Sequence, residues 1–135
     1  MDIRHCTIAG LRWQRDSAEP VIALHGWLDN AATWSRVAPA LDQYNLCAID
    51  FAGHGKSDHR PANAAYHFID NVADVIAVAD RLGWKRFSLL GHSLGASVAT
   101  LVAGTIPERI RSLVCIEGFG PLTTPPEQAP EQLRK

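Results

Sequence analysis

The sequence has almost no excess of charge and no long apolar run, and each absence excludes a class of protein. Its 13 lysines and arginines nearly balance 14 aspartates and glutamates, which gives a formal net charge of −1. Nucleic-acid-binding domains usually carry a basic excess or stripe, so we expect no nucleic acid as a partner. No apolar run approaches the ~20 residues of a membrane-spanning helix, and the first residues lack the apolar stretch of a signal peptide. We therefore expect no membrane association.

Cysteine is scarce and odd in number, which argues against a disulfide framework. The three cysteines are Cys6, Cys47 and Cys115, and the last two lie inside apolar runs. This is the pattern of small buried residues in a reducing compartment, so we expect a cytoplasmic protein. The 135 residues suit one domain, and an apolar content of 47% supplies a core without disulfides or metal.

Four short apolar runs follow one another along the chain, and each ends at a glycine or a polar residue. They are continuous rather than alternating, which is typical of strands that are covered on both faces of a parallel sheet. The runs are Val21–Leu24, Leu46–Ile49, Phe87–Leu90 and Leu113–Ile116.

Three helical patterns lie between these runs, over Thr33–Leu41, Ile69–Ala79 and Leu94–Gly104. Thr33 is the expected cap of the first helix, and Gly83 suits the end of the second. The third is small and apolar nearly all round, so we expect it to be buried. Strands that alternate with helices predict an α/β fold with a mostly parallel sheet.

The two ends of the chain depart from this alternation. Cys6–Ala9 and Leu11–Arg15 flank Gly10 and are expected to form an antiparallel hairpin at one sheet edge, which brings the strand count to about six. Residues 121–130 hold four prolines and almost no apolar residue, which predicts a loop or linker. We expect residues 1–120 to form the core and residues 121–135 to begin a further segment that is truncated.

The stretch Gly91-His92-Ser93-Leu94-Gly95 has the pattern G-x-S-x-G between an apolar run and a small-residue helix. This is the context of a nucleophile elbow, in which serine occupies a sharp turn with strained backbone angles and the glycines avoid Cβ clashes. The turn lifts the hydroxyl to the carboxyl edge of the sheet, above the positive end of a helix dipole. We predict Ser93 as a nucleophile; the alternative is a coincidental glycine-rich turn.

His25-Gly26-Trp27 ends the third expected strand and should lie beside the elbow. The backbone N–H groups of Trp27 and Leu94 are expected to converge on a developing oxyanion, where one donor is worth about 100- to 1,000-fold in rate. For the His25 side chain we favour bracing of the loop through hydrogen bonds over a chemical role.

The stretch Asp50–Ser57 offers another acid and base, Asp50 and His54. They are too close in sequence to face Ser93 from the usual sides, so we favour structural roles for both. His92 adjoins the nucleophile, and a sharp elbow points neighbouring side chains apart, which makes it a poor base. The other histidines are expected in surface or loop segments, and no set of histidines has metal-ligand spacing: His5, His59 and His67.

These motifs, in their order and spacing, resemble the α/β-hydrolase superfamily from about Cys6 to Pro121. Within it the chain is most similar to the serine hydrolase-like proteins. The residues that carry this similarity are His25-Gly26-Trp27-Leu28-Asp29-Asn30, then Asp50-Phe51 with Gly53-His54-Gly55 and Ser57, and Arg86-Phe87-Ser88 before the elbow. Ala96 departs from the pattern, because many relatives have a second glycine there.

The resemblance implies an α/β-hydrolase fold with eight strands, a cap inserted after the sixth strand, and a Ser-acid-His triad without metal or cofactor. The chain should then hold about six strands flanked by helices and lack the last two strands, with residues 121–135 as the start of the cap. Ser93 matches the nucleophile. Glu117, just after the sixth strand, is a candidate acid, and a carboxylate that caps a loop is the alternative. The family's histidine follows the eighth strand, so turnover by these residues alone is expected to fall on the order of a million-fold.

Together these features predict a serine hydrolase for small-molecule carboxylic esters or similar acyl substrates. A serine nucleophile argues against a haloalkane dehalogenase, while a lyase or cofactor-free haloperoxidase with the same triad stays open. The alternative of another class is an inactive truncated fragment that binds a ligand or self-associates through the exposed edge of the sixth strand. Trp27, Leu28 and Trp34 are candidates for an apolar acyl site, and packing of the first helix is the alternative for Trp34.

Overall fold

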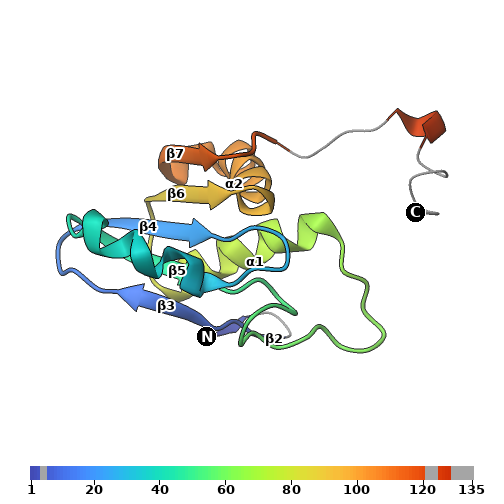
Figure 1. Ribbon diagram of the computed structural model, residues 1–135, viewed down its shortest axis with the longest axis horizontal. Coiled ribbons are helices and arrows are strands. Elements are labelled where there is room, and N and C mark those ends of the chain that lie inside the picture. The colour runs from blue at the N-terminus through green and yellow to red at the C-terminus, as the bar shows by residue number, and fades with distance from the viewer. Residues whose placement is uncertain (4–5, 121–124, 129–135) are drawn as a thin grey trace.

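A five-stranded sheet forms the centre of the computed structural model, which describes residues 1–3, 6–120 and 125–128 (Figure 1). The parallel strands are β4 and β5, β4 and β6, and β6 and β7, whereas β3 runs antiparallel to β5. The carboxyl ends of the four parallel strands therefore meet at one edge. Across the sheet the order is β3 (Gly10–Trp13), β5 (Tyr44–Ile49), β4 (Glu19–Leu24), β6 (Phe87–His92) and β7 (Ile110–Ile116). The predicted α/β fold is confirmed, with five strands in this sheet rather than about six.

The predicted hairpin around Gly10 is wrong. β1 (Asp2–Ile3) and β2 (Cys6–Thr7) pair with each other in a separate two-stranded sheet, and β3 pairs with β5 instead. A Cβ on Gly10 would lie 2.3 Å from the carbonyl oxygen of Ala48. Gly10 therefore allows β3 to approach β5 closely and is not the turn of a hairpin.

The backbone from β2 to β3 forms hydrogen bonds with the loop that follows β5. Asp58 N–H donates to Thr7 O (2.9 Å) and Asp50 N–H donates to Ala9 O (3.0 Å). The N–H of Ala9 donates to Ser57 Oγ (2.9 Å). Since these groups are used by a distant loop, they cannot form the ladder of a local hairpin.

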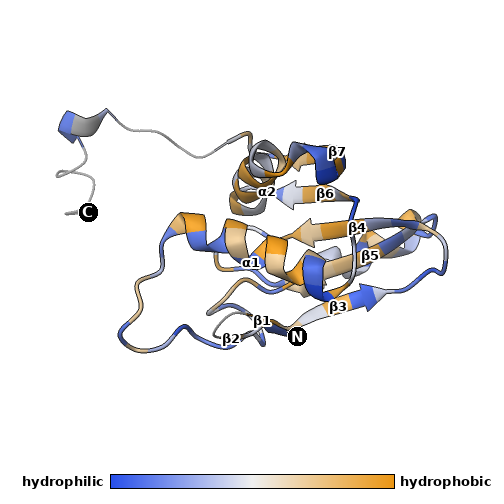
Figure 2. Cartoon of the chain, turned by 180° about the vertical axis from the view of Figure 1, so that it is seen from behind, coloured by the Kyte–Doolittle hydropathy of each residue, from blue (hydrophilic) through white to orange (hydrophobic). Residues whose placement is uncertain are grey.

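Different helices cover the two faces of the sheet. On one face, α1 (Phe68–Arg81) and α2 (Leu94–Thr105) pack together, as seen from behind in Figure 2. The strand residues that point to them alternate with those that point to the other face, as the pleat requires. The first face includes Ile22, Leu24, Cys47, Ile49, Phe87 and Leu89, and the second includes Val21, Ala23, Leu46, Ala48 and Leu90. The second and third predicted helices are present as α1 and α2. Gly83 follows the end of α1 with φ +71°.

The second face is covered by two short 3₁₀ helices, η1 (Ala31–Arg36) and η2 (Ala38–Leu41), where one helix over Thr33–Leu41 was predicted. The cap is Asn30 rather than Thr33, because the Asn30 side chain accepts the N–H of Ala32 at 2.9 Å. A proline lies in the first turn of η2. It lacks the N–H that would continue a hydrogen-bonded helix, which explains the break.

The remaining elements are two 3₁₀ turns, η3 (Pro107–Arg109) before β7 and η4 (Pro126–Gln128) in the proline-rich segment. Most of that segment, predicted as the start of a cap, lies outside the described residues.

Cys47 and Cys115 carry free thiols, and burial raises the pKa of Cys47 to about 11. Within residues 1–3, 6–120 and 125–128 there is no helix whose length and apolar character would let it cross a membrane.

Candidate active site

Ser93 occupies a strained turn between β6 and α2. Its backbone has φ 50° and ψ −111°, a region that residues other than glycine rarely adopt and that is characteristic of functional sites. A Cβ on Gly91 would lie 2.5 Å from Gly95 O, and a Cβ on Gly95 would lie 2.2 Å from Leu24 O. Both glycines of the motif are therefore sterically required, and the turn has the strained geometry that the motif predicted.

Hydrogen bonds of the backbone hold this turn in place. Ser93 N–H donates to Ile116 O at the end of β7 (2.9 Å), and Ser93 O accepts the N–H groups of Ala96 (3.0 Å) and Ser97 (3.1 Å). The Ser93 hydroxyl itself makes no hydrogen bond with any residue that the structure describes. Its oxygen is therefore available to a ligand.

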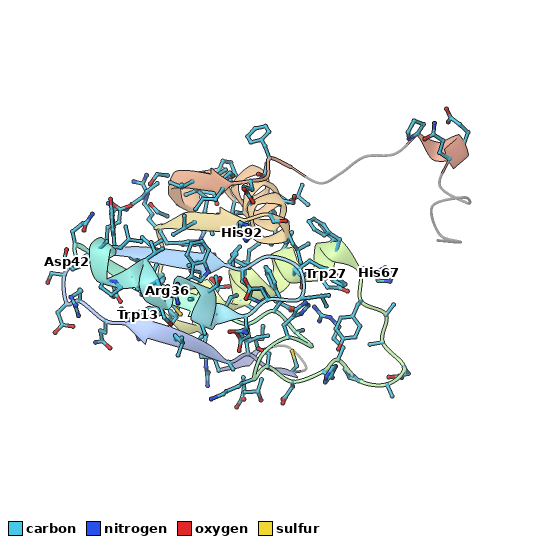
Figure 3. The ribbon with its side chains drawn as sticks, viewed as in Figure 1. Trp13, Trp27, Arg36, Asp42, His67 and His92 are labelled. Atoms are coloured by element: carbon cyan, nitrogen blue, oxygen red, sulfur yellow. The ribbon has the colours of Figure 1, made fainter. Side chains whose placement is uncertain are left out.

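The loop His25-Gly26-Trp27 lies directly against the elbow. A Cβ on Gly26 would come within 2.9 Å of His92 Nδ1 and 3.6 Å of Ser93 Cβ, so a larger residue here would have to displace the His92 ring. Figure 3 shows Trp27 and His92 toward the carboxyl ends of the parallel strands. Leu94 is the first residue of α2, whose first N–H groups have no partner inside the helix. In the described part of the chain, neither Trp27 N–H nor Leu94 N–H donates to an acceptor.

His25 braces this loop. Its side chain is fully buried. Nε2 accepts the N–H of Phe51 (3.1 Å), so Nδ1 carries the proton and donates it to Gly26 O (2.7 Å). Burial lowers the pKa of His25 and keeps the ring neutral. These contacts join the His25–Trp27 loop to the loop after β5 and support the bracing role.

Asp50 holds the loop after β5 and does not reach Ser93. Its buried carboxylate accepts the N–H of Ala31 through Oδ1 (2.6 Å) and the N–H of Lys56 through Oδ2 (2.8 Å). A Cβ on Gly55 would lie 2.2 Å from Oδ2, so glycine makes this turn possible. The structural role that we favoured for Asp50 agrees with these contacts.

None of the described histidines is hydrogen-bonded to Ser93. His54 Nδ1 lies 3.2 Å from Ala52 O, and its ring packs against Trp27 with centroids 5.6 Å apart. His59 Nδ1 lies 3.2 Å from the Tyr66 hydroxyl, and the N–H of His67 donates to the Asp70 carboxylate (3.2 Å). His5 lies outside the described residues. Among the described residues, no three potential ligands are grouped to hold a metal ion.

Glu117 lies on the loop after β7, beside the elbow. Its backbone has a φ of 51°, and its side chain is 81% exposed. Oε2 is 3.5 Å from Nε2 of His92, so the Glu117 side chain contacts this ring. A Cβ on Gly118 would lie 2.9 Å from Ser93 O, which shows how closely the loop packs on the elbow. Ser97 Oγ also donates to Gly120 O and fixes the end of the loop.

One pocket of about 650 Å³ brings several of these groups together. Its lining comprises Trp27, Phe68, Ser93, Leu94, Ser97, Glu117, Gly118, Phe119 and Gly120. The structure thus places Ser93, both predicted oxyanion donors and the candidate acid around one cavity. Trp34 is only 3% exposed and packs from η1 into the cluster on the second face of the sheet, and Leu28 is 79% exposed, so neither lines this pocket.

Phe68 and Phe119 are pocket residues that the sequence analysis missed. A signal for Phe68 exists in the sequence. It is the first residue of a helix that follows a parallel strand, and such a helix begins at the carboxyl edge where ligands bind. Phe119 follows β7 at the same edge.

Comparisons with known proteins agree with this architecture. The profile of the family described as alpha/beta hydrolase fold matches residues 19–135. A serine hydrolase-like protein of Dictyostelium discoideum is 40% identical over 124 residues, which are 90% of this chain and 34% of that protein. A serine hydrolase-like protein of Danio rerio is 42% identical over 118 residues, which are 87% of this chain and 36% of that protein. The chain therefore spans about a third of the length of these relatives, and the predicted similarity to serine hydrolase-like proteins is confirmed.

Solved structures give the same result. A hypothetical protein from Pseudomonas aeruginosa PAO1 superposes with a TM-score of 0.92 at 48% identity, covering 99% of this chain and 48% of that chain. The thioesterase domain from the curacin biosynthetic pathway superposes with a TM-score of 0.85 at 30% identity, covering 99% of this chain and 49% of that chain.

Proposed function

Because this chain belongs to the alpha/beta hydrolase fold family, we propose that it carries the nucleophile and oxyanion site of a serine hydrolase for carboxylic esters or similar acyl substrates. The observation that carries the proposal is the position of Ser93. Its hydroxyl is unbonded among the described residues, stands on a strained turn and lines one pocket with Trp27 and Leu94. No metal or cofactor is needed for this chemistry.

In the proposed reaction, Ser93 Oγ attacks the acyl carbonyl carbon and passes its proton to a base. The N–H groups of Trp27 and Leu94 hold the oxyanion, where each donor is worth about 100- to 1,000-fold in rate. The intermediate collapses to an acyl-serine as the protonated leaving group departs. Water then attacks the acyl-serine, and the acid product and free serine result.

We propose that the base in this scheme is a histidine that is not among these 135 residues, as the family resemblance implies. A serine hydroxyl is a weak nucleophile without a base. His25 and His54 make contacts with the loops beside Ser93 rather than with Ser93 itself. Because the chain spans about a third of the length of its curated relatives, we propose that this residue belongs to a longer, full-length protein that includes these 135 residues.

Glu117 is the candidate acid, because it lines the pocket together with Ser93. Its high exposure and its contact with His92 favour the alternative, a carboxylate that holds the loop after β7. We propose the loop-holding role as the primary one.

For cellular location we propose the cytoplasm, in which the free thiols of Cys47 and Cys115 would persist.

One observation favours the non-enzymatic alternative, in which the protein binds a ligand or self-associates and does not turn over a substrate. Within the described residues β7 pairs only with β6, and Val114 and Ile116 on it are 53% and 42% exposed. An apolar edge strand of this kind invites pairing with another chain. A monomeric protein that turns over esters would contradict this alternative.

The test of the proposed function is the intact mass after treatment with a fluorophosphonate. We expect a single adduct on the full-length protein, its loss in Ser93→Ala, and its retention in Ser97→Ala, which removes the other serine hydroxyl of the pocket. A folded full-length protein without an adduct would contradict the assignment of Ser93. An adduct on the 135 residues alone would contradict the assignment of the base to another part of the protein.

A further inference from the structure

We infer that Phe68 is a specificity-determining residue that limits the length of an uncharged, apolar acyl chain. The inference rests on the proposed function and deepens it. Three aromatic residues from distant segments line the Ser93 pocket: Trp27 after β4, Phe68 at the start of α1, and Phe119 after β7. Apolar pockets of this kind bind substrates through the area of apolar surface that they remove from water.

These three aromatic residues differ in how firmly they are held. Trp27 is 68% exposed and Phe119 is 85% exposed, so they form the rim of the pocket. Phe68 is half-buried and packs against the core cluster beneath α1 and α2. A side chain with one face on the core and the other on the pocket is a fixed wall, which an entering acyl chain cannot displace cheaply.

The backbone around Phe68 is also anchored. The N–H of His67 donates to the Asp70 carboxylate (3.2 Å) at the start of α1. One turn further, Asp74 forms an ion pair with Arg60 of the preceding loop, and these side chains are only 3% and 13% exposed. The Arg60 guanidinium also lies 5.7 Å from the centroid of the Tyr66 ring. The loop before Phe68 and the first two turns of α1 are therefore held together by these contacts.

The charge of the described lining favours one class of substrate. Glu117 is the only ionisable side chain among the lining residues that the structure describes, and lysine and arginine are absent from that set. A carboxylate repels an anionic acyl group, and the described lining offers no lysine or arginine to compensate. The lining is otherwise aromatic, aliphatic, hydroxyl or glycine. An uncharged acyl chain fits this chemistry, and its length is limited where it meets the Phe68 ring.

The experiment compares kcat/KM of the full-length protein across p-nitrophenyl esters from acetate to decanoate. One methylene in an apolar pocket changes kcat/KM by about 10-fold or more. We expect Phe68→Ala to raise the ratio of decanoate to butyrate rates by about 10-fold or more, and Phe68→Trp to lower it. Ile69→Ala is the matched control, because Ile69 lies next on α1, is 59% exposed and is outside the lining. Its profile should equal that of the wild type.

Each outcome separates the inference from the function on which it rests. Opposite shifts in the two Phe68 variants, with an unchanged Ile69→Ala profile, support the inference. An equal loss for all esters in both variants, or an unchanged profile in a wild type that hydrolyses esters, overturns it and leaves the proposed function in place. If Phe68→Ala does not fold, Phe68→Trp decides alone. A wild type with neither ester hydrolysis nor a fluorophosphonate adduct overturns both.

Discussion

Two glycines of α2 are expected to respond in opposite ways to the same substitution. In Gly95→Ala, the new Cβ would lie 2.2 Å from Leu24 O, 2.5 Å from Leu24 C and 2.7 Å from His25 O. All three are backbone atoms at the end of β4, so no side chain can rotate away. The helix and the strand would have to separate by about 0.8 Å merely to reach 3.0 Å, the shortest distance that real Cβ atoms show.

The expected magnitude follows from this geometry. Overpacking a core costs about 1–3 kcal/mol when side chains can adjust, so a clash with fixed backbone should cost about 3 kcal/mol or more. Gly104 lies in the same helix, is exposed and has no atom within 4 Å of its Cβ position. Alanine there restricts the unfolded chain without a clash and should stabilise the protein by about 0.5–1 kcal/mol.

Urea unfolding of the full-length variants, followed by tryptophan fluorescence and circular dichroism, measures both effects. Both substitutions change backbone entropy in the same direction, so the difference between them isolates the contact with Leu24 and His25. A Gly95→Ala protein as stable as the wild type would refute the steric account of the motif. Equal destabilisation by Gly104→Ala would show that α2 does not tolerate alanine for another reason.

Two further predictions concern the loops that support the elbow. Asp50→Asn should cost about 1–3 kcal/mol in the free energy of unfolding, because an amide offers one acceptor to the two N–H groups that Asp50 binds; an unchanged urea midpoint would contradict this role. Because burial lowers the pKa of His25 below its ordinary value of 6.5, the unfolded chain binds more protons than the folded one below that pH. Stability from this group is therefore present above pH 6.5 and declines as the pH falls, by at most about 1.4 kcal/mol per pH unit. His25→Asn should flatten the dependence of the unfolding free energy on pH, whereas an unaltered slope would assign it to other groups.

The sequence alone determined the features whose signals are local. Four continuous apolar runs predicted the cores of β4, β5, β6 and β7. For β4, β5 and β6 the reason is that strands covered on both faces have no polar side, whereas β7 lies at the edge of the sheet and is half exposed. The pattern Gly91 to Gly95 predicted the strained turn. Glycine is sterically required at both of its ends, and this requirement can be recognised from five consecutive residues. Gly83 marked the end of α1 for a different local reason, because its backbone has a positive φ that favours glycine.

Only the tertiary structure decided how distant segments share hydrogen bonds and space. Backbone groups of Thr7 and Ala9 bond to the loop after β5 rather than to β3, and β3 joins β5 instead of closing a hairpin. The pocket is likewise assembled from Trp27, Phe68 and Phe119, which belong to separate elements. Local patterns determine what each segment can form, but partners far along the chain compete for the same backbone groups and apolar surface. That competition is settled only when the strands and helices pack together.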